Sequence, residues 1–122
     1  MDKSHSEQRI IIEMGMGNDL HGQDYTKAAA RGIEDAMRHS TLPLFGALGI
    51  DHDHMRVEVT IGVQKPDQVD CAALVARLPR GQARVLAVPG GLDVTNPNTG
   101  EVTVIAQVAI EAYLPYMGHT DS

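Results

Sequence analysis

Residues 14 to 24 read Met14-Gly15-Met16-Gly17-Asn18-Asp19-Leu20-His21-Gly22-Gln23-Asp24, and the fold is organised around this stretch because a strand pattern ends in it and a helix pattern follows it. Glycines at the end of a strand allow another group to approach the backbone closely, or allow a positive φ. Asp19 and His21 are two positions apart, so an extended backbone would point both side chains to one side. An acid and an imidazole directed at one spot can bind a divalent metal or transfer protons.

The pattern Gly15-x-Gly17-x-Asp19-x-His21-Gly22 resembles the defining motif of a small family of conserved hypothetical proteins found in bacteria and in plants. The resemblance runs from about residue 9 to residue 113 and implies no particular reaction. The segment is also similar to the first strand of the cyclodiphosphate synthase of isoprenoid biosynthesis, a trimer in which a Gly-x-Asp-x-His segment supplies two metal ligands. The rest of that enzyme's pattern is absent, so the similarity implies only a geometry for Asp19 and His21.

The elements on either side of the motif are an apolar strand and an amphipathic helix. The run Ile10-Ile11-Ile12 favours a strand, and apolar side chains on both of its faces indicate an interior strand covered above and below. Asp24 is a good N-cap for a helix of about 15 residues. Residues of that helix recur at positions that make one apolar stripe, namely Ala29, Ile33, Ala36 and Met37.

The second half of the chain predicts one clear strand, a short helix and a hairpin. Apolar and polar residues alternate from Met55 to Val63, which is typical of a half-buried strand. Pro66 and Asp67 begin a second helix, which Pro79 and Gly81 end. A third strand over residues 83–88 is interrupted by glycines and resumes over 92–95. The final strand, from residue 102, should run antiparallel to the third across a turn at residues 96–100.

The predicted fold is therefore α+β, with the order β-α-β-α-β-β and a mixed four-stranded sheet that carries two helices on one face. Residues 9–114 should form one domain, with flexible tails at 1–8 and 115–122. The other face of the sheet would be uncovered and mostly polar, with Arg56, Glu58, Thr60, Thr103, Ile105, Gln107 and Glu111. This face, together with the low content of aromatic residues (3%), favours a homo-oligomer, either a dimer or a trimer.

Composition and charge limit the class of protein. The net charge of −6 argues against a nucleic-acid partner, whose phosphates require clustered Lys and Arg. No apolar run approaches the roughly 20 residues that span a membrane, and the first residues lack a signal-peptide core. A cytoplasmic protein is the simplest interpretation. Cys71, the single cysteine, is more typical of a buried thiol than of a nucleophile.

Four titratable residues in a row, Asp51-His52-Asp53-His54, precede the clearest strand. Alternation would pair Asp51 with Asp53 and His52 with His54, and either pair has a spacing suited to metal ligands. A solvated turn is the competing interpretation. Together with Asp19 and His21, these histidines could hold a divalent metal, Zn or Mg, across a subunit boundary.

Three functions are compatible with the motif. The first is a small-molecule enzyme, a hydrolase or lyase of a polar, cyclic or anionic metabolite, with Asp19, His21 and Lys65 as catalytic candidates; its ligand-binding candidates are Gly15, Gly17, Gly22, Arg84 and Glu111. The second is a module that binds a metal or an anion without turnover, since the helix that follows the motif presents free donors at its N-terminus. The third is a structural turn in which the glycines shape the backbone and Asp19 caps the helix. We also expect Asp19 and His21 to be dispensable for folding.

Overall fold

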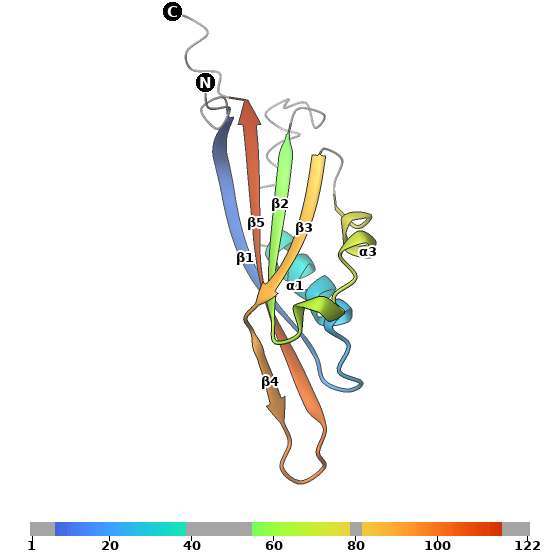
Figure 1. Ribbon diagram of the computed structural model, residues 1–122. Helices are drawn as coiled ribbons and strands as arrows, with labels where there is room; N and C mark the ends of the chain where they lie inside the picture. The colour runs from blue at the N-terminus through green and yellow to red at the C-terminus, as the bar shows by residue number, and fades with distance from the viewer. Residues whose placement is uncertain (1–6, 39–54, 79–81, 116–122) are drawn as a thin grey trace, which may run out of the picture.

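The computed structural model describes residues 7–38, 55–78 and 82–115. Five strands of this part form one mixed sheet in the spatial order β1-β5-β2-β3, and β4 pairs with β5 (Figure 1). β5 lies in the middle of the sheet and is antiparallel to each of its neighbours, whereas β2 and β3 are parallel. The strands are β1 (Glu7–Asp19), β2 (Arg56–Val63), β3 (Gln82–Pro89), β4 (Leu92–Thr95) and β5 (Val102–Pro115).

The predicted α+β class is confirmed, but the four-stranded sheet is wrong in its count and in one pairing. The segment Leu92–Thr95 is a separate strand, and it alone forms the predicted hairpin with β5. β3 pairs with β2 instead. The chain changes course between β3 and β4, where Pro89 offers no N–H to continue a ladder and Gly91 has a φ of +58°.

The helices and the 3-10 turn lie on one face of the sheet, as predicted (Figure 1). The long helix is α1 (Tyr25–Arg38), and Asp24 caps it: the Lys27 N–H donates to Asp24 Oδ1 at 3.0 Å. The predicted stripe is confirmed, because Ala29, Ile33 and Ala36 are buried against the sheet. None of the described helices is long and apolar enough to span a bilayer.

The second predicted helix is shorter than expected and begins later. Pro66 starts only a 3-10 turn, η3 (Pro66–Gln68), and an extended Val69 separates it from α3 (Cys71–Val75). The break has a clear cause: the Asp70 N–H donates to Thr26 Oγ1 of α1 at 2.8 Å, which anchors the extended segment. The Asp70 side chain then accepts from the Ala73 N–H at 3.1 Å, so Asp70 rather than Asp67 caps the helix.

The core lies between the helices and one face of the sheet. β2 shows the predicted alternation, with its apolar residues from Val57 to Val63 buried and the residues between them part-exposed. β1 contradicts the prediction of a strand covered on both faces. In the described part of the chain it is an edge strand, and Ile12 and Met14 are exposed on the face that no described helix covers, called the uncovered face below.

Candidate functional site

The predicted site lies in the turn between β1 and α1. The chain leaves the strand after Asp19 and reverses through two consecutive residues with positive φ, Gly22 at +87° and Gln23 at +53°. This reversal brings the Asp24 N–H to Asp19 Oδ2, at 2.9 Å. The end of the strand is thereby fastened to the start of the helix.

Asp19 is almost fully buried, with 2% of its surface exposed. Its other oxygen, Oδ1, lies 3.8 Å from Lys27 Nζ and 3.9 Å from Arg31 Nη1. The carboxylate therefore has a donor on one oxygen and two cations near the other, which offset the cost of burying its charge. A metal ion bound to Asp19 would have to compete with both cations.

The two glycines before Asp19 let α1 pack against the backbone of β1. A Cβ atom added to Gly15 would lie 2.6 Å from the Gly32 carbonyl oxygen, and one added to Gly17 would lie 2.7 Å from the Arg31 carbonyl carbon. Both distances are far inside van der Waals contact, so no larger residue fits without moving the helix. These glycines lie beneath α1, where their structural role is a close helix–strand contact.

His21 has surroundings different from those of Asp19. β1 ends at Asp19, so the alternation that would have aimed both side chains at one spot does not extend to His21. The imidazole is largely exposed, and its Nδ1 lies 3.0 Å from Glu101 Oε2, just before β5 begins. Sequence reasoning missed Glu101. The register of strand pairing is the signal that could have indicated it. Asp19 pairs with Val104 in antiparallel strands, so extending the pairing puts position 21 opposite position 102, next to Glu101.

The other predicted ligand residues divide between the two ends of the sheet. Lys65 is exposed and directly precedes η3, at the end of the sheet where β1 also finishes. Arg84 and Glu111 lie on the uncovered face toward the opposite end, both level with Glu58 of β2. Glu111 is seven positions along β5 from the partner of Asp19, which corresponds to roughly 23 Å at about 3.3 Å per residue. A single ligand in one subunit would not contact both ends.

Glu111 belongs to an ion-pair network on the uncovered face. Arg9 Nη1 donates to its Oε2 at 3.0 Å, and the Tyr113 hydroxyl donates to the same oxygen at 3.0 Å. The bond from Arg9, helped by the bond from Tyr113, outweighs burial and lowers the pKa of Glu111 below its ordinary value.

A partly buried network that the sequence did not predict lies beside the same turn. The Tyr25 hydroxyl, at the start of α1, donates to Asp93 Oδ2 of β4 and accepts from Gln23 Nε2 at 3.2 Å. Burial first, and then the bond to Asp93, raise the pKa of Tyr25 above its ordinary value, so the hydroxyl remains a donor. Within the described residues, Asp93 Oδ1 is buried without a hydrogen-bond partner.

The metal prediction remains a prediction. His52 and His54 lie outside the described residues. Over residues 7–38, 55–78 and 82–115, no group of three or more His, Cys, Asp or Glu side chains is placed to hold a metal ion. Cys71 is partly buried at the start of α3.

Comparisons with known proteins extend over nearly the whole chain. A family model described as "Conserved hypothetical protein (Lin0512_fam)" matches residues 9–112. Among solved structures, the chain is similar to a protein from Nostoc punctiforme PCC 73102 described as FtsZ-like and of unknown function, with 34% sequence identity and a TM-score of 0.78. That alignment covers 91% of this chain and 98% of the other. No curated protein matches.

Proposed function

We propose that this chain, which belongs to the Lin0512 family of conserved hypothetical proteins, is a small-molecule enzyme, a hydrolase or lyase. In this proposal His21 transfers the proton and Glu101 orients His21. The observation that carries the proposal is the 3.0 Å contact between His21 Nδ1 and Glu101 Oε2. A carboxylate bound to one ring nitrogen holds the imidazole in one orientation and tautomer. The other nitrogen, Nε2, is then available to take a proton from a substrate or from water.

The position of His21 supports this role in two ways. Its side chain is 74% exposed, so a substrate can reach it. The turn that carries it is fixed by the Asp19 bond to the Asp24 N–H and by the backbone at Gly22. A group on a fixed turn loses little orientational freedom when the substrate binds, which favours catalysis.

Positive charge beside the turn suggests the substrate class. Lys27 and Arg31 lie on the first two turns of α1, and about half of each side chain is exposed. Their nitrogens are 3.8 and 3.9 Å from Asp19 Oδ1, which is longer than a hydrogen bond, so the ion pairs leave donors for another anion. We therefore propose a polar or cyclic metabolite that carries an anionic group.

The same cations favour a second candidate, an anion-binding module without turnover. In that case a carboxylate or phosphate would bind between Lys27 and the exposed part of Arg31, and His21 would contribute only a hydrogen bond. A divalent metal, Zn or Mg, held by His21 with other residues is a variant of this candidate.

The experiment is to incubate the protein with a panel of cyclic and anionic metabolites, with and without Mg²⁺ or Zn²⁺, and to follow each compound by NMR. We expect His21→Gln to lower the rate for a converted compound by roughly 10²- to 10⁴-fold without changing the melting temperature. Glu101→Gln should cause a smaller loss and change the pH profile of kcat. Arg38→Gln, at the far end of α1, is the matched control and should behave like the parent.

Two results would contradict the proposal that the chain is an enzyme. Equal conversion by the parent and by His21→Gln would remove His21 from the chemistry. Binding of an anion without conversion, weakened by Lys27→Gln, would favour the second candidate instead.

A further inference from the structure

The uncovered face of the sheet collects most of the large apolar side chains that the described residues expose. Strand register places six of them on this face, across β1, β3 and β4. Each has between 43% and 69% of its surface exposed: Ile12, Met14, Met16, Leu86, Leu92 and Val94. Their exposed surface is on the order of 600 Å² in sum and is divided between β1 on one side of the face and β3 and β4 on the other. Exposed apolar surface of a few hundred Å² often marks an interaction site.

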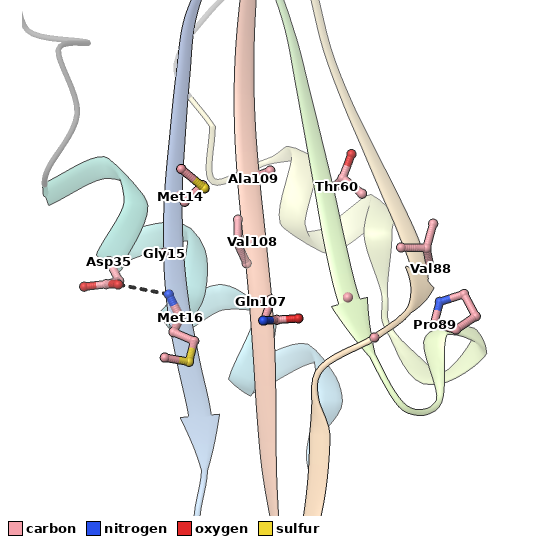
Figure 2. A pocket seen from close by; sticks show the side chains of 12 residues that line it. Met14, Gly15, Met16, Asp35, Thr60, Val88, Pro89, Gln107, Val108 and Ala109 are labelled. Atoms are coloured by element: carbon pink, nitrogen blue, oxygen red, sulfur yellow. Dashed lines mark hydrogen bonds between the residues drawn. The ribbon is translucent and has the colours of Figure 1, made fainter.

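This face has both a hollow and a ridge. The hollow has a volume of about 560 Å³, and small residues of the two central strands, such as Gly62 and Ala109, line it. Met14 and Met16 of β1 stand on one side of it, and Val88 of β3 on the other (Figure 2). The two methionines are 69% and 58% exposed, and we call this pair the Met14–Met16 ridge. Their flexible side chains suit an apolar contact that must adapt in shape.

The charges on this face cancel, although the chain as a whole has a net charge of −6. Among the described residues, the face has three acidic and three basic side chains, gathered at one end: Glu7, Arg9, Arg56, Glu58, Arg84 and Glu111. Arg9 pairs with Glu111 at 3.0 Å, and Arg56 pairs with Glu7 at 3.0 Å. A second copy can therefore approach this face without meeting an excess of like charge.

The outer edge of β1 is less suited to self-association than the face. Asp35 Oδ2 accepts from the Met16 N–H at 2.9 Å (Figure 2), and Arg31 Nη1 donates to the Asn18 carbonyl at 2.8 Å. Side chains of α1 thus occupy backbone groups that an added strand would need.

We propose that two copies of this chain associate face to face about a two-fold axis, so that the Met14–Met16 ridge of each copy fills the hollow of the other. A two-fold contact requires a surface that is complementary to itself, and this face carries both parts of such a contact. The exposed surface of the six apolar residues, on the order of 600 Å², approaches the roughly 800 Å² that each partner buries in an interface of standard size. The inference is independent of the proposed chemistry at His21.

The test uses the full chain and measures mass in solution by light scattering at micromolar concentration. We expect about twice 13.1 kDa for the parent. Met16→Glu, in the ridge, and Thr60→Lys, in the hollow, should each give 13.1 kDa. Both substitutions are on an accessible face, so the circular dichroism melting curve of each monomer should remain cooperative. Val75→Glu, at an exposed apolar position of α3 on the other layer, is the matched control and should retain the parent mass.

Mixing the two variants tests the geometry. In a mixed pair, the carboxylate introduced by Met16→Glu in one copy lies beside the ammonium introduced by Thr60→Lys in the other, and the second contact stays native. Association should therefore return. A parent of 13.1 kDa would overturn the proposal, as would a mass unaffected by both substitutions or a mixture that stays monomeric. A monomeric parent that sediments with phosphatidylcholine vesicles would assign the face to lipid instead, and would also overturn it.

Discussion

The two faces of β1 show opposite packing within one strand. Toward α1 the strand presents Gly15 and Gly17, and the helix backbone lies directly on them. Toward the uncovered face the same strand presents Met14 and Met16, which are 69% and 58% exposed. An ordinary surface strand places its large apolar residues in the core and its small or polar residues outside. In this strand, residue size follows the distance to the neighbouring layer: no space remains under the helix, whereas no described element packs on Met14 and Met16.

Substitutions on the two faces should therefore have very different costs, and Gly17→Ala is expected to have the largest effect. Its methyl group would meet the backbone of α1 at Gly32 and Ala28, which cannot move without displacing the helix. We expect a loss of about 3 kcal/mol in the free energy of unfolding, measured by urea titration. Met16→Ala on the other face should change that free energy by less than about 0.5 kcal/mol at concentrations where the chain is monomeric. Similar costs for the two variants would show that the helix does not lie on the glycines.

A smaller difference should separate the two polar residues of the turn. Burial of Asp19 makes our expectation that it is dispensable for folding unsound, because its carboxylate accepts from the Asp24 N–H and faces two cations. Asp19→Asn should cost about 1–3 kcal/mol. His21→Gln should cost almost nothing, since its contact with Glu101 is exposed. Melting curves of both variants at pH 7 test this, and an Asp19→Asn protein as stable as the parent would contradict the structural role of the carboxylate.

The smallest predicted effect concerns the charged end of the uncovered face. Removing the donor with Arg9→Ala should raise the pKa of Glu111 toward its ordinary value, which carboxyl NMR during a pH titration can measure. A lowered pKa in the folded state stabilises the protein above the pKa of the unfolded state, and this stabilisation is lost as the pH falls through the folded pKa. The free energy of unfolding of the parent should thus exceed that of the variant by less than about 1 kcal/mol near pH 7, and this difference should disappear in acid. An unchanged pKa of Glu111 would show that Arg9 does not hydrogen-bond to Glu111 in solution.

Periodicity alone was sufficient for two elements, the α1 stripe and β2, because each has one buried face and one exposed face. It failed for β1, where the run Ile10-Ile11-Ile12 suggested cover on both sides. The pairing of β1 with β5 is irregular between Arg9 and Ile11, and β1 lies at the edge of the sheet; a run of three isoleucines indicates neither property. The break between η3 and α3 depends on a bond from Asp70 to Thr26, which is 44 residues away, and no local pattern contains it.

The sequence predicted where the candidate site lies in the chain, but not which distant residues contact it. The glycine and aspartate pattern located the turn, and the N-cap at Asp24 followed from the sequence. Glu101 is 80 residues from His21, and Asp93 is 68 residues from Tyr25, so both contacts depend on how β5 and β4 align with the rest of the sheet. Pairing register is a tertiary property, and a single sequence does not specify it by local preference.

The order of the strands affects how this chain folds during synthesis. β5 joins β1 to β2 and also pairs with β4, yet it is the last of the five strands along the chain. On a ribosome, β1 emerges before the other described strands, and its one strand partner in the described part of the chain, β5, follows only when residues 102–115 have left the exit tunnel. The sheet therefore cannot be completed before β5 has emerged, and until then the exposed methionines and isoleucines of β1 are available to chaperones.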